Sequence, residues 1–212
     1  MTDQDLLQEC QYHLVEEGPD GGAAWSSGCW TREELLAYLT HRQSRYQGDA
    51  ALIVRSTDPP HLAVAAGALR VNLPADWLFT ISAIWRDAAN HVPLIRSDAW
   101  EADHGLPTWP TLAGVPQVYT EQDVPTLTIQ LIPAPALDGN LELLYVTAGD
   151  ELTGDGVQAL GPDELSHLYK YGALADALGK DGRGRDLVRA GYCQMRYQLG
   201  VEIGEILLSG WS

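Results

Sequence analysis

The chain has 212 residues, 45% of them apolar and 20% charged, which is typical of a globular protein of one large domain or two small ones. Its net charge of −16, with only 13 Lys and Arg residues, argues against a protein that reads nucleic-acid sequence, because phosphate contacts need clustered basic side chains. No apolar run reaches the roughly 20 residues of a membrane helix, and the acidic start at residues 1–5 does not resemble a signal peptide, so we expect a cytosolic product.

An amphipathic helix is predicted between Thr2 and Glu16. Apolar side chains recur there at the three- and four-residue steps of one helix face: Leu6, Leu7, Cys10 and Leu14. The glycine-rich residues 18–22 then interrupt the pattern, so the helix should end in a loop.

A second helix should begin after Trp30. Thr31 and Glu34 have the spacing of a capping box, in which Thr31 caps the first turn and the Glu34 side chain reaches back. Trp30 is then placed to pack on Leu35 as a hydrophobic staple. The helix should end by Gly48, and its apolar stripe consists of Leu35, Leu36, Leu39 and Tyr46.

The middle of the chain, residues 51–148, has short apolar or alternating runs separated by Pro and Gly, which is typical of strands. Strands are expected at 62–66, 68–73, 78–85, 91–95, 117–120, 126–132 and 141–146. Residues 127–131 and 141–145 should be antiparallel neighbours, because a proline-rich loop that ends in Asp-Gly-Asn connects them. A short capped helix is expected near 97–101, and residues 153–156 should form the exit from the strand region.

The last fifty residues predict a helical hairpin. Its first helix, 164–179, follows Pro162 and Asp163, which favour a helix start, and carries small residues where another backbone could approach. A turn at 180–184 leads to a second helix, 186–208. The apolar stripe of this second helix consists of Val188, Tyr192, Met195, Leu199, Ile203 and Ile206. Neither helix can bury its stripe alone, so both stripes should pack elsewhere in this chain, most simply in a core, or on neighbouring molecules.

Helices at both ends with strands between them predict an α+β fold. Residues 1–50 and 150–212 should form one helical bundle, and residues 51–149 an inserted antiparallel β domain that resembles a sandwich or barrel. Such an insertion requires the two helical segments, which are distant in sequence, to pack on each other.

No catalytic site, metal site or cofactor is predicted. The histidines are scattered without ligand spacing, at His13, His41, His61, His91, His104 and His167. Residues 100–104 place carboxylates beside an imidazole and could form an unrecognised metal or enzyme site, but a solvated turn is the favoured interpretation. The glycine-rich residues 154–156 and 182–184 lack a phosphate-loop pattern and are interpreted as turns. The three cysteines, Cys10, Cys29 and Cys193, are expected to be buried thiols.

The seven tryptophans leave a carbohydrate-binding module open as an alternative. Trp85, Trp100 and Trp109 fall in the strand region, where flat rings could stack on sugars. The favoured interpretation is that Trp77 and Trp85 anchor the β core, while Trp25 and Trp30 cover the helices.

Several segments together resemble the head-to-tail adaptor, or connector, proteins of tailed bacteriophages. Residues 30–39 are similar to the family's N-terminal helical entry, Trp-x-x-x-Glu-Leu-Leu-x-Tyr-Leu. The similar segments that follow are 73–77, 114–119, 131–135, 139–145, and then 169–175, 180–182 and 189–193 in the closing helical hairpin. The resemblance covers most of the chain, and the order of the segments carries it.

The resemblance implies a structural protein of the virion neck that is not an enzyme and is assembled in the host cytoplasm. Such proteins form a ring of identical subunits, typically twelve, that docks on the portal and meets a tail nozzle, hub or tail-completion protein. The ring lines a channel through which DNA passes without sequence-specific binding, and no cofactor or membrane anchor is implied. An excess of acid would suit such a channel, although solubility alone also explains it.

Two helices, residues 35–46 and 187–207, are the expected ring-forming elements, and the strand region is expected to contact the tail or a neighbouring subunit. Trp211 could dock on a neighbour or the portal, or merely cover its own helix. The residues expected at the subunit or portal interface are Leu35, Leu39, Tyr46, Tyr169, Tyr192, Leu199, Ile203, Leu207 and Trp211. A carbohydrate-binding β module of a phage tail component is the alternative function.

Overall fold

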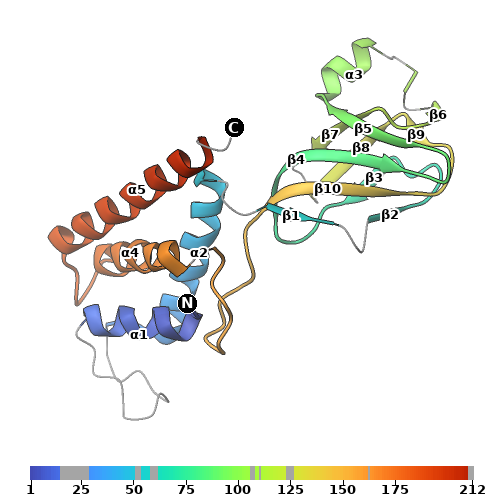
Figure 1. Ribbon diagram of the computed structural model, residues 1–212. Helices are drawn as coiled ribbons and strands as arrows, with labels where there is room; N and C mark the ends of the chain where they lie inside the picture. Colours follow the sequence, from blue (N-terminus) through green and yellow to red (C-terminus); the bar gives the residue numbers. More distant parts are fainter. Residues whose placement is uncertain are drawn as a thin grey trace. The chain divides into compact units, whose positions relative to one another are not determined.

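The computed structural model describes residues 1–14, 29–50, 54–57, 62–105, 108–109, 111–122, 127–161 and 163–209. The chain divides into two compact units, one formed by Met1–Ile53 with Thr147–Ser212 and the other by Val54–Val146. Helices build the first unit and strands most of the second (Figure 1). The predicted α+β fold, with helices at both ends and a strand region between them, is confirmed.

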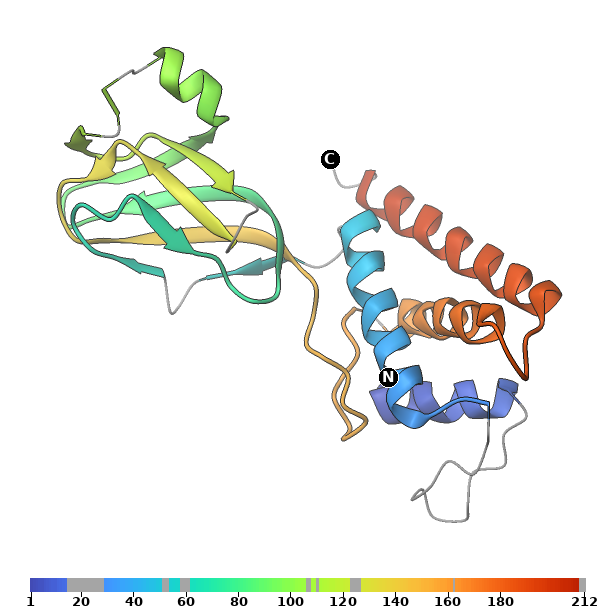
Figure 2. The ribbon, with the colours of Figure 1, turned by 180° about the vertical axis from the view of Figure 1, so that it is seen from behind.

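In its described residues the helical unit consists of α1 (Asp3–Leu14), α2 (Arg32–Ala50), α4 (Asp163–Gly179) and α5 (Leu187–Ser209). Helix α4 packs against the other three, and Figure 2 shows it from behind, between α1 and α5. The helices expected at 2–16, 30–48, 164–179 and 186–208 are present. The expected end of the first helix at Glu16, and Pro162 before the third helix, lie outside the described residues. Both ends of the chain supply the shared core, which includes Leu6, Leu35, Leu39, Tyr46, Tyr169 and Leu174.

The segment that follows the strand unit is anchored to the helical unit by Asp3. The fully buried Asp3 carboxylate accepts hydrogen bonds from the backbone N–H groups of Gly154 (2.6 Å) and Gly156 (2.9 Å). Both glycines have positive φ angles, 82° and 89°, which side chains of L-residues rarely adopt. The expected exit from the strand region at 153–156 was wrong, because the strand unit ends at Val146 and this turn belongs to the helical unit.

The strand unit contains strands of two to ten residues. They are β1 (Val54–Ser56), β2 (Leu62–Val64), β3 (Arg70–Asn72), β4 (Trp77–Arg86), β5 (His91–Arg96), β6 (Ala113–Gly114), β7 (Val118–Gln122), β8 (Thr128–Ile132), β9 (Ala134–Pro135) and β10 (Gly139–Thr147). Each strand expected from the sequence is present. The strands β1, β6 and β9 were not expected.

Most of these strands form one curled sheet that resembles half of a barrel. Its order is β1-β10-β4-β5-β7-β8-β3, with β2 also paired to β10, while β6 and β9 pair separately. In this sheet β5 and β7 are parallel, since the chain between them crosses over through α3 (Ala99–Gly105). The short helix expected near 97–101 is α3, and the Asp98 carboxylate caps it by accepting a hydrogen bond from the Glu101 N–H at 2.7 Å.

The expected pairing of residues 127–131 with 141–145 was wrong. Strand β8 lies between β7 and β3, and β10 lies between β4 and the pair β1 and β2. The link between them is not a hairpin turn, because it contains β9, which pairs with β6 and directs the chain away from β8. A proline-rich connection therefore did not predict which strand becomes the neighbour.

Two tryptophans anchor the core of the strand unit. Trp77 and Trp85 are both buried and pack with Leu131, Leu141 and Tyr145. A Cβ on Gly139 would lie 2.4 Å from the Trp85 ring and 2.6 Å from the Arg86 carbonyl oxygen. The start of β10 therefore needs glycine to pass over the indole, and the favoured interpretation of Trp77 and Trp85 as core residues is confirmed.

Candidate functional site

Helix α5 has two apolar faces, and its inner face, turned toward its own unit, carries mostly small residues. These buried residues are Ala190, Cys193, Tyr197, Gly200, Val201 and Gly204. At Gly200 the packing is close, because a Cβ there would lie 2.3 Å from the Leu168 side chain of α4. The helix therefore packs on its own unit without using its large aliphatic side chains.

The outer face of α5 carries those large side chains, and they are exposed. We call this set the outer stripe: Leu187, Val188, Tyr192, Met195, Leu199, Ile203, Ile206 and Leu207. Their exposed fractions range from 46% for Leu199 and Leu207 to 84% for Val188. The simplest interpretation of the sequence, which placed this stripe in the core of the hairpin, was wrong, because small residues occupy the inner face. A contiguous exposed apolar surface typically marks an interaction site.

The interface residues expected from the sequence fall into two groups. Leu35, Leu39, Tyr46 and Tyr169 are at most 1% exposed and pack in the core of their own unit, so they cannot reach a second molecule in this conformation. Tyr192, Leu199, Ile203 and Leu207 belong to the outer stripe. Trp211 lies outside the described residues. The structure thus brings the exposed members together on α5 and leaves α2 as a core helix.

The start of α2 has the expected cap with a different role for the glutamate. The Thr31 hydroxyl accepts a hydrogen bond from the Glu34 N–H at 3.1 Å. The Glu34 carboxylate accepts from the Tyr38 hydroxyl (3.0 Å) and the Lys180 ammonium (2.6 Å) instead of reaching back to Thr31. These contacts, with that from Lys180 the largest, lower the pKa of Glu34. The Trp30 indole is buried and donates to the Ala177 carbonyl oxygen at 2.8 Å, so Trp30 also ties α2 to α4.

A buried polar cluster holds α2, α4 and α5 together, and sequence reasoning missed it. The Arg42 Nε donates to the Asp176 carboxylate at 2.7 Å, and the Arg42 guanidinium lies 4.9 Å from the centre of the Tyr197 ring. Burial raises the pKa of Tyr46 and Tyr197 to about 12, so both phenols stay neutral and act as hydrogen-bond donors. Arg42 continues the spacing of Leu35 and Leu39, a signal that could have placed it on the buried face of α2.

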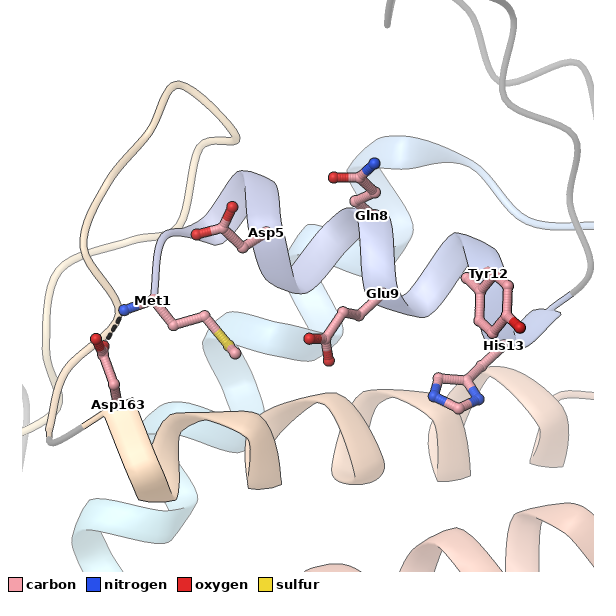
Figure 3. Close-up of a pocket in the computed structure, with 7 residues that line it drawn as sticks. All are labelled: Met1, Asp5, Gln8, Glu9, Tyr12, His13 and Asp163. Atoms are coloured by element: carbon pink, nitrogen blue, oxygen red, sulfur yellow. Dashed lines mark hydrogen bonds and ion pairs between the residues drawn. The ribbon is translucent and has the colours of Figure 1, made fainter.

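A groove of about 700 Å³ lies beside α1 in the helical unit (Figure 3). It is lined by Met1, Asp5, Gln8, Glu9, Tyr12, His13 and Asp163. Its acidic groups already have partners: the Met1 amino group contacts Asp163, the Thr2 N–H donates to Asp5, and Lys170 pairs with Glu9. Desolvation lowers the pKa of His13. The groove therefore holds satisfied side chains of a helix start rather than a poised acid and base.

Within residues 100–104, Trp100 and His104 contact each other. The centroids of the Trp100 and His104 rings lie 4.1 Å apart, and the His104 Nδ1 contacts the Trp100 carbonyl oxygen at 2.8 Å. Within the described part of the chain, no group of three or more His, Cys, Asp or Glu side chains is placed to hold a metal ion. Cys10 and Cys193 are buried free thiols, whereas Cys29 is half-buried. Burial raises the pKa of Cys10 to about 12, which makes this thiol unreactive.

The described tryptophans do not form an aromatic platform. Trp85 is fully buried and Trp109 is 9% exposed, while Trp100 is 68% exposed and stacks on His104. Trp30 lies in the helical core as expected, and Trp25 lies outside the described residues. Among the helices that the structure describes, none is long and apolar enough to cross a membrane.

A comparison with protein families extends this geometry. The family described as SU10 adaptor protein matches residues 1–205, which is nearly the whole chain. No curated protein matches the sequence. The match includes both helical segments and the strand unit, so the insertion of strands between helices is a feature of the matched region as a whole.

Proposed function

The chain belongs to the SU10 adaptor protein family, and from this premise we propose that it is a head-to-tail adaptor that forms a ring between the portal and the tail of a phage. In this proposal the ring is dodecameric, belongs to the virion neck and is assembled in the host cytoplasm. Its partners are further copies of itself, the portal, and a tail nozzle, hub or tail-completion protein. No residue is assigned a catalytic role, and no cofactor is required.

The outer stripe of α5 carries this proposal. An adaptor acts through its surfaces, and the stripe places eight exposed apolar side chains on one helix of 23 residues, about 34 Å long. Removing such side chains from water stabilises association by about 25 cal/mol per Å² of apolar surface. The interface residues that remain available are Tyr192, Leu199, Ile203 and Leu207, with Trp211 as a further proposed member.

The acidic composition supports a channel role. A net charge of −16 per subunit is multiplied around a ring, so the walls of a central channel offer phosphate groups little to bind. DNA would then pass without sequence-specific contacts. The half-barrel strand unit is proposed to contact the tail or a neighbouring subunit.

Mixing the purified protein with a portal ring tests the proposal. Native mass spectrometry should show several copies of the wild-type protein on each portal ring, and Leu199→Asp should abolish this binding, because a charge in the middle of the stripe must be desolvated on docking. Since Leu199 is 46% exposed, the variant should keep the circular dichroism spectrum and melting temperature of the wild type.

Ile81→Asp is the matched control, since Ile81 is 49% exposed and lies on β4 of the strand unit. It should leave portal binding unchanged. A wild-type protein that does not bind the portal, or a Leu199→Asp variant that binds as well as the wild type, would contradict the proposal. The carbohydrate-binding alternative gains no support from the buried positions of Trp85 and Trp109.

A further inference from the structure

Charged residues lie on both sides of the outer stripe, and the two sides have opposite signs. Arg189 and Arg196 are seven residues apart and therefore share one side of α5, which we call the Arg flank. Glu202 and Glu205 are three residues apart and share the other side, which we call the Glu flank. At 3.6 residues per turn, the Arg flank and the Glu flank fall on opposite edges of the stripe.

The side chains of both flanks are exposed, and the two arginines also contact their own unit. All four are exposed, and within the described residues no hydrogen bond or ion pair engages Glu202 or Glu205. Arg196 lies 5.2 Å from the centre of the Tyr171 ring, and Arg189 donates to the His13 carbonyl oxygen. Two neighbouring carboxylates of like charge repel each other on a helix surface, so the Glu flank gains from a cationic partner.

We propose that the α5 helices of adjacent copies lie side by side, with the Arg flank of one copy against the Glu flank of the next. This inference rests on the proposed ring and names its subunit contact. Because the two flanks differ, the contact is heterologous, and a heterologous contact generates a closed ring when its rotation closes, as the proposed ring requires. Each copy uses both flanks, so no copy inside the ring leaves a flank unpaired.

The charges also decide against a two-fold antiparallel pair of α5 helices. In that arrangement each flank faces the same flank of its partner, so the Arg flank of one copy does not face the Glu flank of the other. Like charges that face each other across an interface disfavour association. The head-to-tail arrangement instead places opposite charges on facing flanks. Because the arginines lie in the first half of α5 and the glutamates in the second half, Arg196 meets Glu202 when neighbouring helices are staggered by about 9 Å.

Two apolar residues at the edges of the outer stripe lie beside the Arg flank and the Glu flank. Leu207 lies on the side of the Arg flank and Leu187 on the side of the Glu flank, and both are exposed. They can therefore contact a neighbouring copy. The middle of the stripe, at Tyr192, Met195 and Leu199, points away from both flanks and stays free for the portal. One helix can thus bind a neighbour and the portal at the same time.

Cysteine pairs test the arrangement on portal rings. A mixture of the Arg196→Cys and Glu202→Cys variants should give a disulfide-linked dimer on oxidation, because position 196 of one copy faces the Glu flank of the next copy. The Arg196→Cys variant alone should give no such dimer, because position 196 does not face position 196 of a neighbour. The wild-type protein, with Cys10, Cys29 and Cys193, is the control for links through native thiols. Efficient self-linking of Arg196→Cys would indicate the two-fold pair, and either that result or the absence of a link in the mixture would overturn the proposal.

Charge reversal with rescue supplies an independent measurement. The double variants R189E/R196E and E202R/E205R should each raise the protein concentration needed to fill the portal ring by about tenfold or more. The combined quadruple variant restores opposite flanks and should assemble like the wild type. Failure of the rescue, or full assembly of both double variants, would refute the flank pairing. If every variant still binds the portal as single copies, docking on the portal is intact. A loss of ring assembly alone would then refute the flank pairing without refuting the proposed function.

Discussion

At the scale of single residues, glycine decides how closely α5 approaches its own unit. Gly200 and Gly191 stand on the same helix but on opposite faces. A Cβ at Gly200 would meet three atoms of the Leu168 side chain within 2.8 Å, whereas a Cβ at Gly191 would meet nothing within 4 Å. The same substitution should therefore have opposite effects at the two positions.

We expect Gly200→Ala to lower the free energy of unfolding by about 1–3 kcal/mol, because the added methyl group overpacks the contact between α4 and α5. Gly191→Ala should raise it by about 0.5–1 kcal/mol, since alanine restricts the unfolded chain and favours helix at an open position. Urea denaturation of both variants measures the two changes. Equal effects at the two positions would show that the close approach at Gly200 does not exist.

At the scale of elements, the start of α2 combines a cap with a tertiary contact. The Thr31 hydroxyl satisfies a backbone N–H of the first turn, a local interaction typically worth about 1 kcal/mol. Trp30 should contribute more to stability than Thr31. Its ring is buried beside Gly184, and its indole N–H donates a hydrogen bond to the Ala177 carbonyl oxygen near the end of α4. The aromatic residue before the cap should therefore matter more than the cap itself.

Trp30→Ala should lower the free energy of unfolding by about 3–5 kcal/mol, as expected for removal of a buried aromatic side chain. Thr31→Ala should lower it by only about 1 kcal/mol. Trp100→Ala is the matched control for the loss of an indole, because Trp100 is 68% exposed, and its effect should stay within about 0.5 kcal/mol. Thermal denaturation followed by circular dichroism compares the three. Wild-type stability of Trp30→Ala would defeat the capping and packing argument.

At the scale of the whole molecule, the strand unit is inserted through a single pair of neighbouring chain segments. Val54 at the start of the unit and Val146 at its end are directly opposite in the antiparallel pair of β1 and β10. Their Cα atoms are therefore about 5 Å apart. The segments that enter and leave the unit are close enough for a few residues to bridge them.

Replacement of residues 54–146 by a short Gly-Ser linker should leave a helical unit that still unfolds cooperatively, because the core residues that the structure describes for this unit come from both ends of the chain and none from 54–146. The isolated segment 54–146 should give the circular dichroism spectrum of a β protein. Calorimetry of the two fragments and the whole chain checks this. A helical fragment that unfolds without a transition would mean that the two units stabilise each other.

Local signals in the sequence were sufficient to predict the helices and the longer strands. The helix starts, the amphipathic stripes and the alternating runs depend on residues a few positions apart, so they located α1, α2, α4, α5 and the longer strands. The order of the strands was not predictable in this way. The partner of β10 depends on how the chain crosses between β8 and β10, and a loop sequence does not encode a neighbour that lies elsewhere in the sheet.

The sequence by itself determined the α+β organisation, the strand region between terminal helices, and the resemblance that the family match bears out, because these follow from periodicity and from the order of motifs. Only the tertiary structure decided which face of α5 is buried. Both faces of that helix are apolar, and periodicity identifies a face without saying what covers it. Glycine at position 200 lets α5 pack closely on the Leu168 side chain of α4, and the small residues of α5 face inward while the large ones remain exposed.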